Sequence, residues 1–160
     1  MTKSLLIRRY NQDDIEQCIV NIGQYMSGET YSDGNDHFKG LDFDREKMYK
    51  ELKKHLNDVN FFCNLIVADG EIVGGLCAYV ASPIFSSDTF AYDQFIYVVP
   101  SFKHPTAILR LIKSYIEWAE NRKVKQCYLR TSTLYKETGF TKLCQRLGFS
   151  HYETGFAKEM

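Results

Sequence analysis

The stretch Phe95–Trp118 constrains the fold more than any other part of the chain. It begins with an apolar segment that predicts a β-strand, and Pro100 ends that strand because proline cannot donate a backbone hydrogen bond. A basic turn follows, and then a segment whose apolar residues recur at helical spacing. Pro105 is expected at the first position of this helix, where its missing N–H costs nothing.

The start of this helix is a candidate anion site. The first N–H groups of an α-helix have no acceptor within the helix, and the helix dipole favours negative charge there. Lys103 lies just before the helix, and Thr106 adds a hydroxyl group. The alternative is a capped helix start with a solvated lysine, because motifs this short also arise by chance.

Length and charge exclude several classes of protein. The chain has 160 residues, with 20 Lys+Arg and 20 Asp+Glu, so its formal net charge is zero. This length predicts a single domain over residues 1–160, and the balanced charge argues against general nucleic-acid binding and against binding to a membrane surface. No segment approaches the ~20 apolar residues of a membrane span, so we expect a cytoplasmic protein.

The chain has five cysteines and four histidines, and neither set shows the spacing of a metal site. We therefore expect no metal. The odd number of cysteines and their apolar surroundings predict buried, reduced thiols, which fits a reducing cytoplasm.

Strand and helix signals alternate along the chain. Expected strands are Leu5–Tyr10, Phe61–Ala68, Ile72–Ser82, Phe90–Val99 and Val124–Arg130, with one or two more in Phe149–Lys158. Expected helices follow Asn11–Asp14, follow Asp44, begin near Pro105 and cover Thr138–Leu147, with Gly148 ending the last one. Asp69-Gly70 predicts a tight hairpin, and Ser27–Phe43 predicts a long loop. This order predicts an α/β fold with a mixed sheet and helices on both faces.

Several of these segments together resemble the GCN5-related N-acetyltransferase (GNAT) superfamily. The residues that carry the resemblance are Ile7-Arg8-Arg9, Tyr97-Val98-Val99-Pro100, Phe102-Lys103, Ala107 to Leu111 and Gln145-Arg146-Leu147-Gly148-Phe149. The spacing is most similar to a divergent branch found in phage and bacterial genomes. The resemblance implies a mostly antiparallel central sheet whose fourth and fifth strands splay apart, with acetyl-coenzyme A (acetyl-CoA) bound in the gap.

The resemblance also implies which residues contact the cofactor. The pantetheine arm would pair with the fourth strand at Ile96, Tyr97 and Val98, and the pyrophosphate would lie on the turn that holds Lys103, His104, Thr106, Ala107 and Ile108. In the family this turn is rich in glycine. Here Thr106 and Ile108 replace two of the glycines, and Pro105 removes one potential N–H donor.

Direct acetyl transfer to an amine requires a base, an oxyanion donor and an acid for the leaving sulfur. The resemblance implies Val98 N–H as the donor and Asp93, at the start of the fourth strand, as the base; the alternative is an exposed strand-end aspartate. Cys144 stands where the family has its tyrosine acid, and core packing is the preferred interpretation of that thiol. Tyr135 is a substitute acid.

The leading hypothesis is an N-acetyltransferase that transfers an acetyl group from acetyl-CoA to a primary amine, on a small molecule or a protein lysine. Acidic residues in the two loops expected near the acceptor would suit a cationic amine or simply solvate the loops: Glu29, Asp33, Asp36, Asp42 and Asp88. The rival hypotheses are an inactive binding or regulatory module and a CoA-binding sensor, because the glycines and the tyrosine are missing. Family members often form dimers, so a homodimer is a further expectation.

Overall fold

The computed structural model describes residues 4–27, 42–130 and 139–152. Within these ranges the elements are β1 (Leu5–Arg9), the 3-10 turn η1 (Gln12–Asp14), α1 (Ile15–Ser27), α2 (Arg45–Lys54), β2 (Phe61–Ala68), β3 (Glu71–Ala81), β4 (Phe90–Val98), α3 (Ala107–Asn121), β5 (Gln126–Tyr128) and α4 (Gly139–Arg146). No helix in these ranges is long and apolar enough to cross a bilayer.

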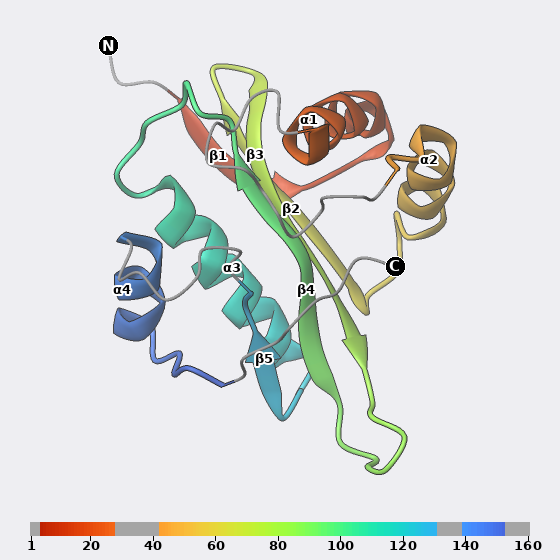
Figure 1. Cartoon of the computed structure of the whole chain (residues 1–160), viewed down its shortest axis with the longest axis vertical. Helices are drawn as coiled ribbons and strands as arrows, with labels where there is room; N and C mark the ends of the chain where they lie inside the picture. Colours follow the sequence, from red (N-terminus) through yellow and green to blue (C-terminus); the bar gives the residue numbers. More distant parts are fainter. Residues whose placement is uncertain (1–3, 28–41, 131–138, 153–160) are drawn as a thin grey trace.

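The strands form one sheet in the order β1-β2-β3-β4-β5. All neighbouring strands are antiparallel except β4 and β5, which run parallel. Helices α1 and α2 cover one face of the sheet, while α3 and α4 lie on the other (Figure 1). The predicted mixed α/β architecture is therefore confirmed.

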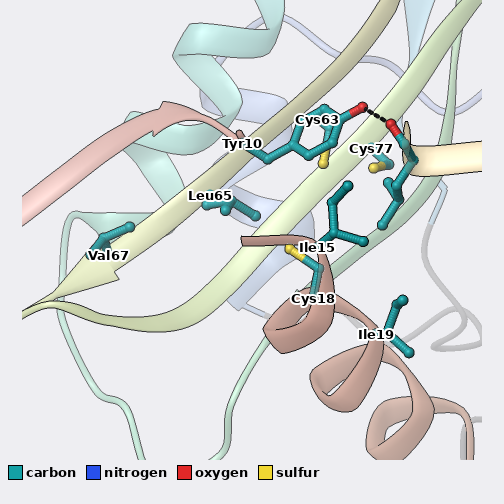
Figure 2. Packing of buried hydrophobic residues seen from close by; sticks show 9 residues of the cluster. Tyr10, Ile15, Cys18, Ile19, Cys63, Leu65, Val67 and Cys77 are labelled. Carbon is teal, nitrogen blue, oxygen red and sulfur yellow. Dashed lines mark hydrogen bonds between the residues drawn. The ribbon is translucent and has the colours of Figure 1, made fainter. Parts of the chain in front are cut away.

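Strand β2 is buried on both faces, because its side chains alternate between two cores. Cys63, Leu65 and Val67 pack against α1 and α2, as Figure 2 shows for α1. Phe62 and Ile66 point to the opposite face and pack against α3. A strand covered on both faces has an almost continuous apolar sequence, which is the pattern of Phe61–Ala68.

Most of the expected boundaries are confirmed within a residue or two. The Asp69-Gly70 hairpin has positive φ at both turn residues, 52° and 87°, as a tight turn of this kind requires. Gly148 follows α4 with a φ of 87°, which only glycine adopts readily. The five cysteines are free thiols, and three of them are buried.

Three expectations differ from the structure, and one is not tested by it. β5 covers three residues instead of Val124–Arg130, because β4 and β5 separate after Tyr128. Residues 149–152 form no strand, and the rest of that expected strand lies outside the described residues. Pro105 is not the first helical residue: α3 begins at Ala107 after a turn in which Ala107 N–H donates to the His104 carbonyl. Residues 28–41 of the predicted loop also lie outside the described residues.

The chain enters α1 through a hydrogen-bonded cap. Asn11 caps η1, and the Asp14 carboxylate accepts the Asn11 N–H at 2.8 Å, which completes a capping box. The same carboxylate accepts two hydrogen bonds from the Arg8 guanidinium, at 2.6 and 2.9 Å. The Arg8 hydrogen bonds lower the pKa of Asp14, although burial opposes them. This pair joins the end of β1 to the start of α1.

Asp14→Asn should lower the free energy of unfolding by about 1–3 kcal/mol near neutral pH, because it weakens charge-assisted hydrogen bonds in a half-buried pair. A lowered carboxyl pKa contributes stability above the unfolded value of 3.8, and that stability is lost as the pH falls through the folded value. Urea titrations of both proteins from neutral to acidic pH should therefore converge at low pH. A constant difference across the range would contradict this account.

Gly74 of β3 pairs with Val98 of β4 and leaves no room for a side chain. A Cβ at this position would lie 2.8 Å from the Tyr97 carbonyl oxygen and 3.0 Å from Ile66 Cδ1. The carbonyl belongs to backbone within the sheet, so the strands themselves would have to shift. Only glycine fits here without moving β4.

Gly74→Ala should therefore lower the melting temperature, at a cost of about 1–3 kcal/mol that is typical of overpacking. The matched control is Gly139→Ala, because a Cβ at Gly139 meets nothing within 4 Å. Differential scanning calorimetry of both variants checks the prediction. Equal melting temperatures for the two variants would contradict it.

Candidate active site at the open edge of strand β4

The candidate site begins where β5 leaves β4. The two strands pair only at Phe90–Gln126, Ala91–Cys127 and Tyr92–Tyr128. Beyond Tyr92, β4 continues for six more residues without a partner strand on this side among the described residues. An extended ligand can add to the edge of a sheet by pairing with its backbone as a further strand.

A β-bulge in β4 lies next to this separation. Ala78 of β3 pairs with Asp93 and Cys77 pairs with Phe95, so Gln94 is an extra residue in β4. A bulge bends its strand and increases the local twist. Here it redirects β4 two residues after the last pair with β5, which widens the gap between the two strands.

Two groups hold the strands together at the apex of the gap. Asp93 Oδ2 accepts the backbone N–H of Arg130 at 3.1 Å, and Asp93 Oδ1 accepts from Arg130 Nε at 3.2 Å. Arg130 Nη2 also donates to the Asp93 carbonyl. From α3, the buried Tyr115 hydroxyl lies 3.1 Å from the Ala91 carbonyl oxygen of β4 and 3.0 Å from the Tyr128 carbonyl oxygen of β5.

Asp93 is not an exposed strand-end residue. It lies inside β4 and is 2% exposed. Burial raises the pKa of this carboxyl group, while the hydrogen bonds and charge of Arg130 lower it in part. Both carboxylate oxygens accept from Arg130, so these hydrogen bonds connect β4 to the segment that follows β5. The assignment of Asp93 as the base stays a prediction.

The backbone of β4 alternates between its two edges. Val99 N–H donates to Val73 of β3 at 2.8 Å, and the Tyr97 carbonyl faces Gly74 of β3. Because backbone groups of successive strand residues point to opposite sides, those of Ile96 and Val98 point toward the open edge. These are two of the three residues expected to pair with an extended cofactor arm.

A pocket with a volume of about 190 Å³ lies along this edge. It is lined by residues from β4, α1, the first turn of α3, the segment just after β5 and α4. In that order they are Ile96, Tyr97 and Val98, then Tyr25, Ile108, Arg130 and Phe140. Four of these seven were expected to bind the cofactor on sequence grounds. Ile108 is ten or more residues from the three strand residues in the sequence, so only tertiary packing brings it next to them.

The basic turn leads into α3 beside this pocket. Lys103 is exposed, and His104 Nδ1 lies 3.4 Å from both the Thr106 N–H and the Thr106 hydroxyl. Thr106 is the N-cap of α3 but makes no side-chain capping bond, and Ala107 is buried. The N–H groups of Ile108 and Leu109 therefore start the helix without intrahelical acceptors. The position of Pro105 before the helix leaves these donors intact.

Neither of the two candidate acids, Cys144 and Tyr135, is among the described residues that line the pocket. Cys144 lies half-buried on α4 and is not among the residues lining the pocket; burial raises the pKa of its thiol. Tyr135 and three of the acidic loop residues, Glu29, Asp33 and Asp36, lie outside the described residues. Their predicted roles are not tested.

Sequence reasoning missed Tyr25, Arg130 and Phe140 as pocket residues. Arg130 carried one usable signal, since it is the charged residue that ends an apolar strand pattern. Phe140 belongs to the apolar stripe expected of the last helix, and Tyr25 carried no sequence signal of a site. Among the described residues, no group of three or more His, Cys, Asp or Glu side chains is arranged to bind a metal ion.

Tyr115→Phe should lower the free energy of unfolding by about 1 kcal/mol, because it removes the hydroxyl that bridges β4 and β5 from inside the core. The matched control is Tyr152→Phe, since Tyr152 is 68% exposed. Guanidinium titrations of both variants test this. A loss of stability in Tyr152→Phe as large as that in Tyr115→Phe would show that the bridge is not responsible.

Comparison with known structures supports this fold. The chain is similar to an aminoglycoside acetyltransferase, HMB0005, from an uncultured soil metagenomic sample, with a TM-score of 0.71 and 18% identity over 98% of this chain and 99% of that one. It is also similar to AAC(6')-Iy in complex with the bisubstrate analog CoA-S-monomethyl-acetylneamine, with a TM-score of 0.69 and 18% identity over 98% of both chains.

A third similar structure is a predicted acetyltransferase with acetyl-CoA from Clostridium acetobutylicum, with a TM-score of 0.72 and 11% identity over 98% of this chain and 96% of that one. No curated protein matches the sequence. The family model described as "Acetyltransferase (GNAT) family" matches residues 29–149, about three quarters of the chain. With a splayed β4–β5 pair and an open β4 edge as well, the chain belongs to the GNAT acetyltransferase family.

Proposed function

We propose that this protein transfers the acetyl group of acetyl-CoA to a primary amine. The observation that carries the proposal is the pocket on the open edge of β4, where the backbone groups of Ile96 and Val98 face the space beside Ile108 and Arg130. An extended pantetheine arm carries amide groups that can pair with such an edge in the manner of an added strand.

The start of α3 suits the pyrophosphate of the same ligand. Its first N–H groups and its dipole favour an anion. Exposed Lys103 lies in the preceding turn, three residues before the N-cap residue Thr106. A lysine neutralises phosphate as a point charge and lacks the bidentate fork of arginine. The side chains of Thr106 and Ile108 occupy space that glycine would leave open, so we expect weaker cofactor binding than a glycine-rich turn would give.

In the proposed reaction a neutral amine attacks the thioester carbonyl. The Val98 N–H points to the open edge, where it would donate to the oxyanion as charge develops. The acceptor class that we propose is an amine-bearing small molecule, because similar solved structures are aminoglycoside acetyltransferases. A protein lysine is the alternative acceptor.

One observation favours a second candidate function, a CoA-binding sensor. Cys144 occupies the position at which the family has its tyrosine acid, and it does not line the pocket. A sensor would bind acetyl-CoA without transferring its acetyl group. Release of free thiol in the presence of a panel of amines, including aminoglycosides and lysine peptides, separates an enzyme from a sensor.

Lys103→Glu should weaken acetyl-CoA binding about tenfold, which corresponds to about 1.4 kcal/mol, because it puts negative charge at the anion site. Isothermal titration calorimetry measures the affinity, and the acetyl-CoA-dependent rise in melting temperature provides a second readout. The matched control is Lys113→Glu, which reverses the charge of an exposed residue in the middle of α3.

Equal weakening in both variants would mean that overall charge, not the turn, controls affinity. No rise in the melting temperature of the unmodified protein at millimolar acetyl-CoA would overturn the enzyme and the sensor together.

A further inference from the structure

Acetyl transfer leaves a negative charge on the sulfur of CoA. One side chain that lines the pocket can stabilise this charge. Among the described residues that line the pocket, Arg130 alone carries a charge; the others are aliphatic or aromatic. A guanidinium group remains protonated at any pH at which a protein is folded. It can stabilise a thiolate by charge without transferring a proton.

Arg130 is held in a defined place. Its backbone N–H and Nε bind the two carboxylate oxygens of Asp93, and its Nη2 binds the Asp93 carbonyl. These contacts leave the Nη1 donors, for which no acceptor occurs in the described parts of the chain. The guanidinium group is therefore positioned by β4 itself, the strand proposed to hold the cofactor.

The carboxylate partner lies behind the guanidinium group. The Arg130 side chain is 58% exposed, whereas the Asp93 side chain is 3% exposed and does not line the pocket. A ligand in the pocket thus meets the cation and not its counter-ion. Asp93 acts as a positioning residue for Arg130 in this arrangement.

We propose that Arg130 stabilises the departing CoA thiolate by charge, in place of a hydroxyl acid on α4. This inference rests on the proposed function. The C–N bond forms between the acceptor amine and the acetyl carbonyl carbon, and the C–S bond then breaks, with its electron pair going to sulfur. The amine nitrogen loses its extra proton to water, and the thiolate, paired with Arg130, takes a proton from water when CoA is released.

Two tyrosines that line the pocket, Tyr25 and Tyr97, are the alternative groups that could act on the leaving sulfur. Tyr97 is 3% exposed, its hydroxyl lies 3.4 Å from Asn21 Nδ2, and burial raises its pKa, so its proton is hard to give up. Tyr25 lies on α1 with its ring 6.1 Å from the ring of Tyr97. A role for Tyr25 as the acid is a distinct outcome of the experiment.

The experiment measures the pKa of the CoA thiol while CoA is bound, which needs no acceptor. Thiolate is detected by its ultraviolet absorbance across a pH series at saturating CoA, and calorimetry confirms binding at each pH. The variants are Arg130→Gln, which removes the charge; Arg130→Lys, which keeps it; and Tyr25→Phe.

In the unmodified protein the bound thiol should have a pKa below that of free CoA by about 1, the effect expected of one opposite charge at close range. Arg130→Gln should abolish this difference, Arg130→Lys should keep most of it, and Tyr25→Phe should leave it unchanged. A bound thiol in the unmodified protein with a pKa at or above the free value overturns the inference, whatever the variants do.

The other outcomes are equally decisive. If Arg130→Gln binds CoA and keeps the lowered thiol pKa, or if Tyr25→Phe alone abolishes it, Arg130 is not the group that stabilises the thiolate. If the unmodified protein binds no CoA, the proposed function fails and this inference with it. If CoA binds with an unchanged thiol pKa, only this inference fails and the proposed function stands.

Discussion

The short pairing of β4 with β5 is the constraint on which the site depends. Three residue pairs join the strands, and beyond them the edge of β4 is left open. Separation at this point follows from the bulge at Gln94, which redirects β4, and from the Asp93–Arg130 contacts, which fix where β5 ends. A fully paired β5 would use the same backbone groups for the sheet and leave none for a ligand.

The two cores give this open edge a rigid support. Strands β2 and β3 are packed on both faces, so they hold β4 from one side with little freedom to move. Helix α3 packs on the sheet through a fully buried face and presents its first turn beside the gap. The close contact at Gly74 keeps β3 and β4 in register directly opposite the residues that line the pocket.

The described residues that line the pocket include a single charged side chain. The pocket walls are aliphatic and aromatic apart from Arg130, and in such surroundings a single charge acts more strongly than it would in water. The hydrogen bonds and charge of Arg130 offset part of the desolvation cost of the buried Asp93 carboxylate. One ion pair therefore joins two strands and places a cation at the site.

Local sequence determined the elements of this fold, because helix spacing, strand patterns, caps and the Asp-Gly turn act over a few residues. It also identified Ile96–Val98 and Ile108 as pocket residues, through the strand–turn–helix order and the family resemblance. The length of β5, the burial of Asp93 and the presence of Arg130, Tyr25 and Phe140 in the pocket were decided only by the tertiary structure. Each depends on which strands separate and which helices meet across the gap, and contacts between distant residues leave no periodic signal in the sequence.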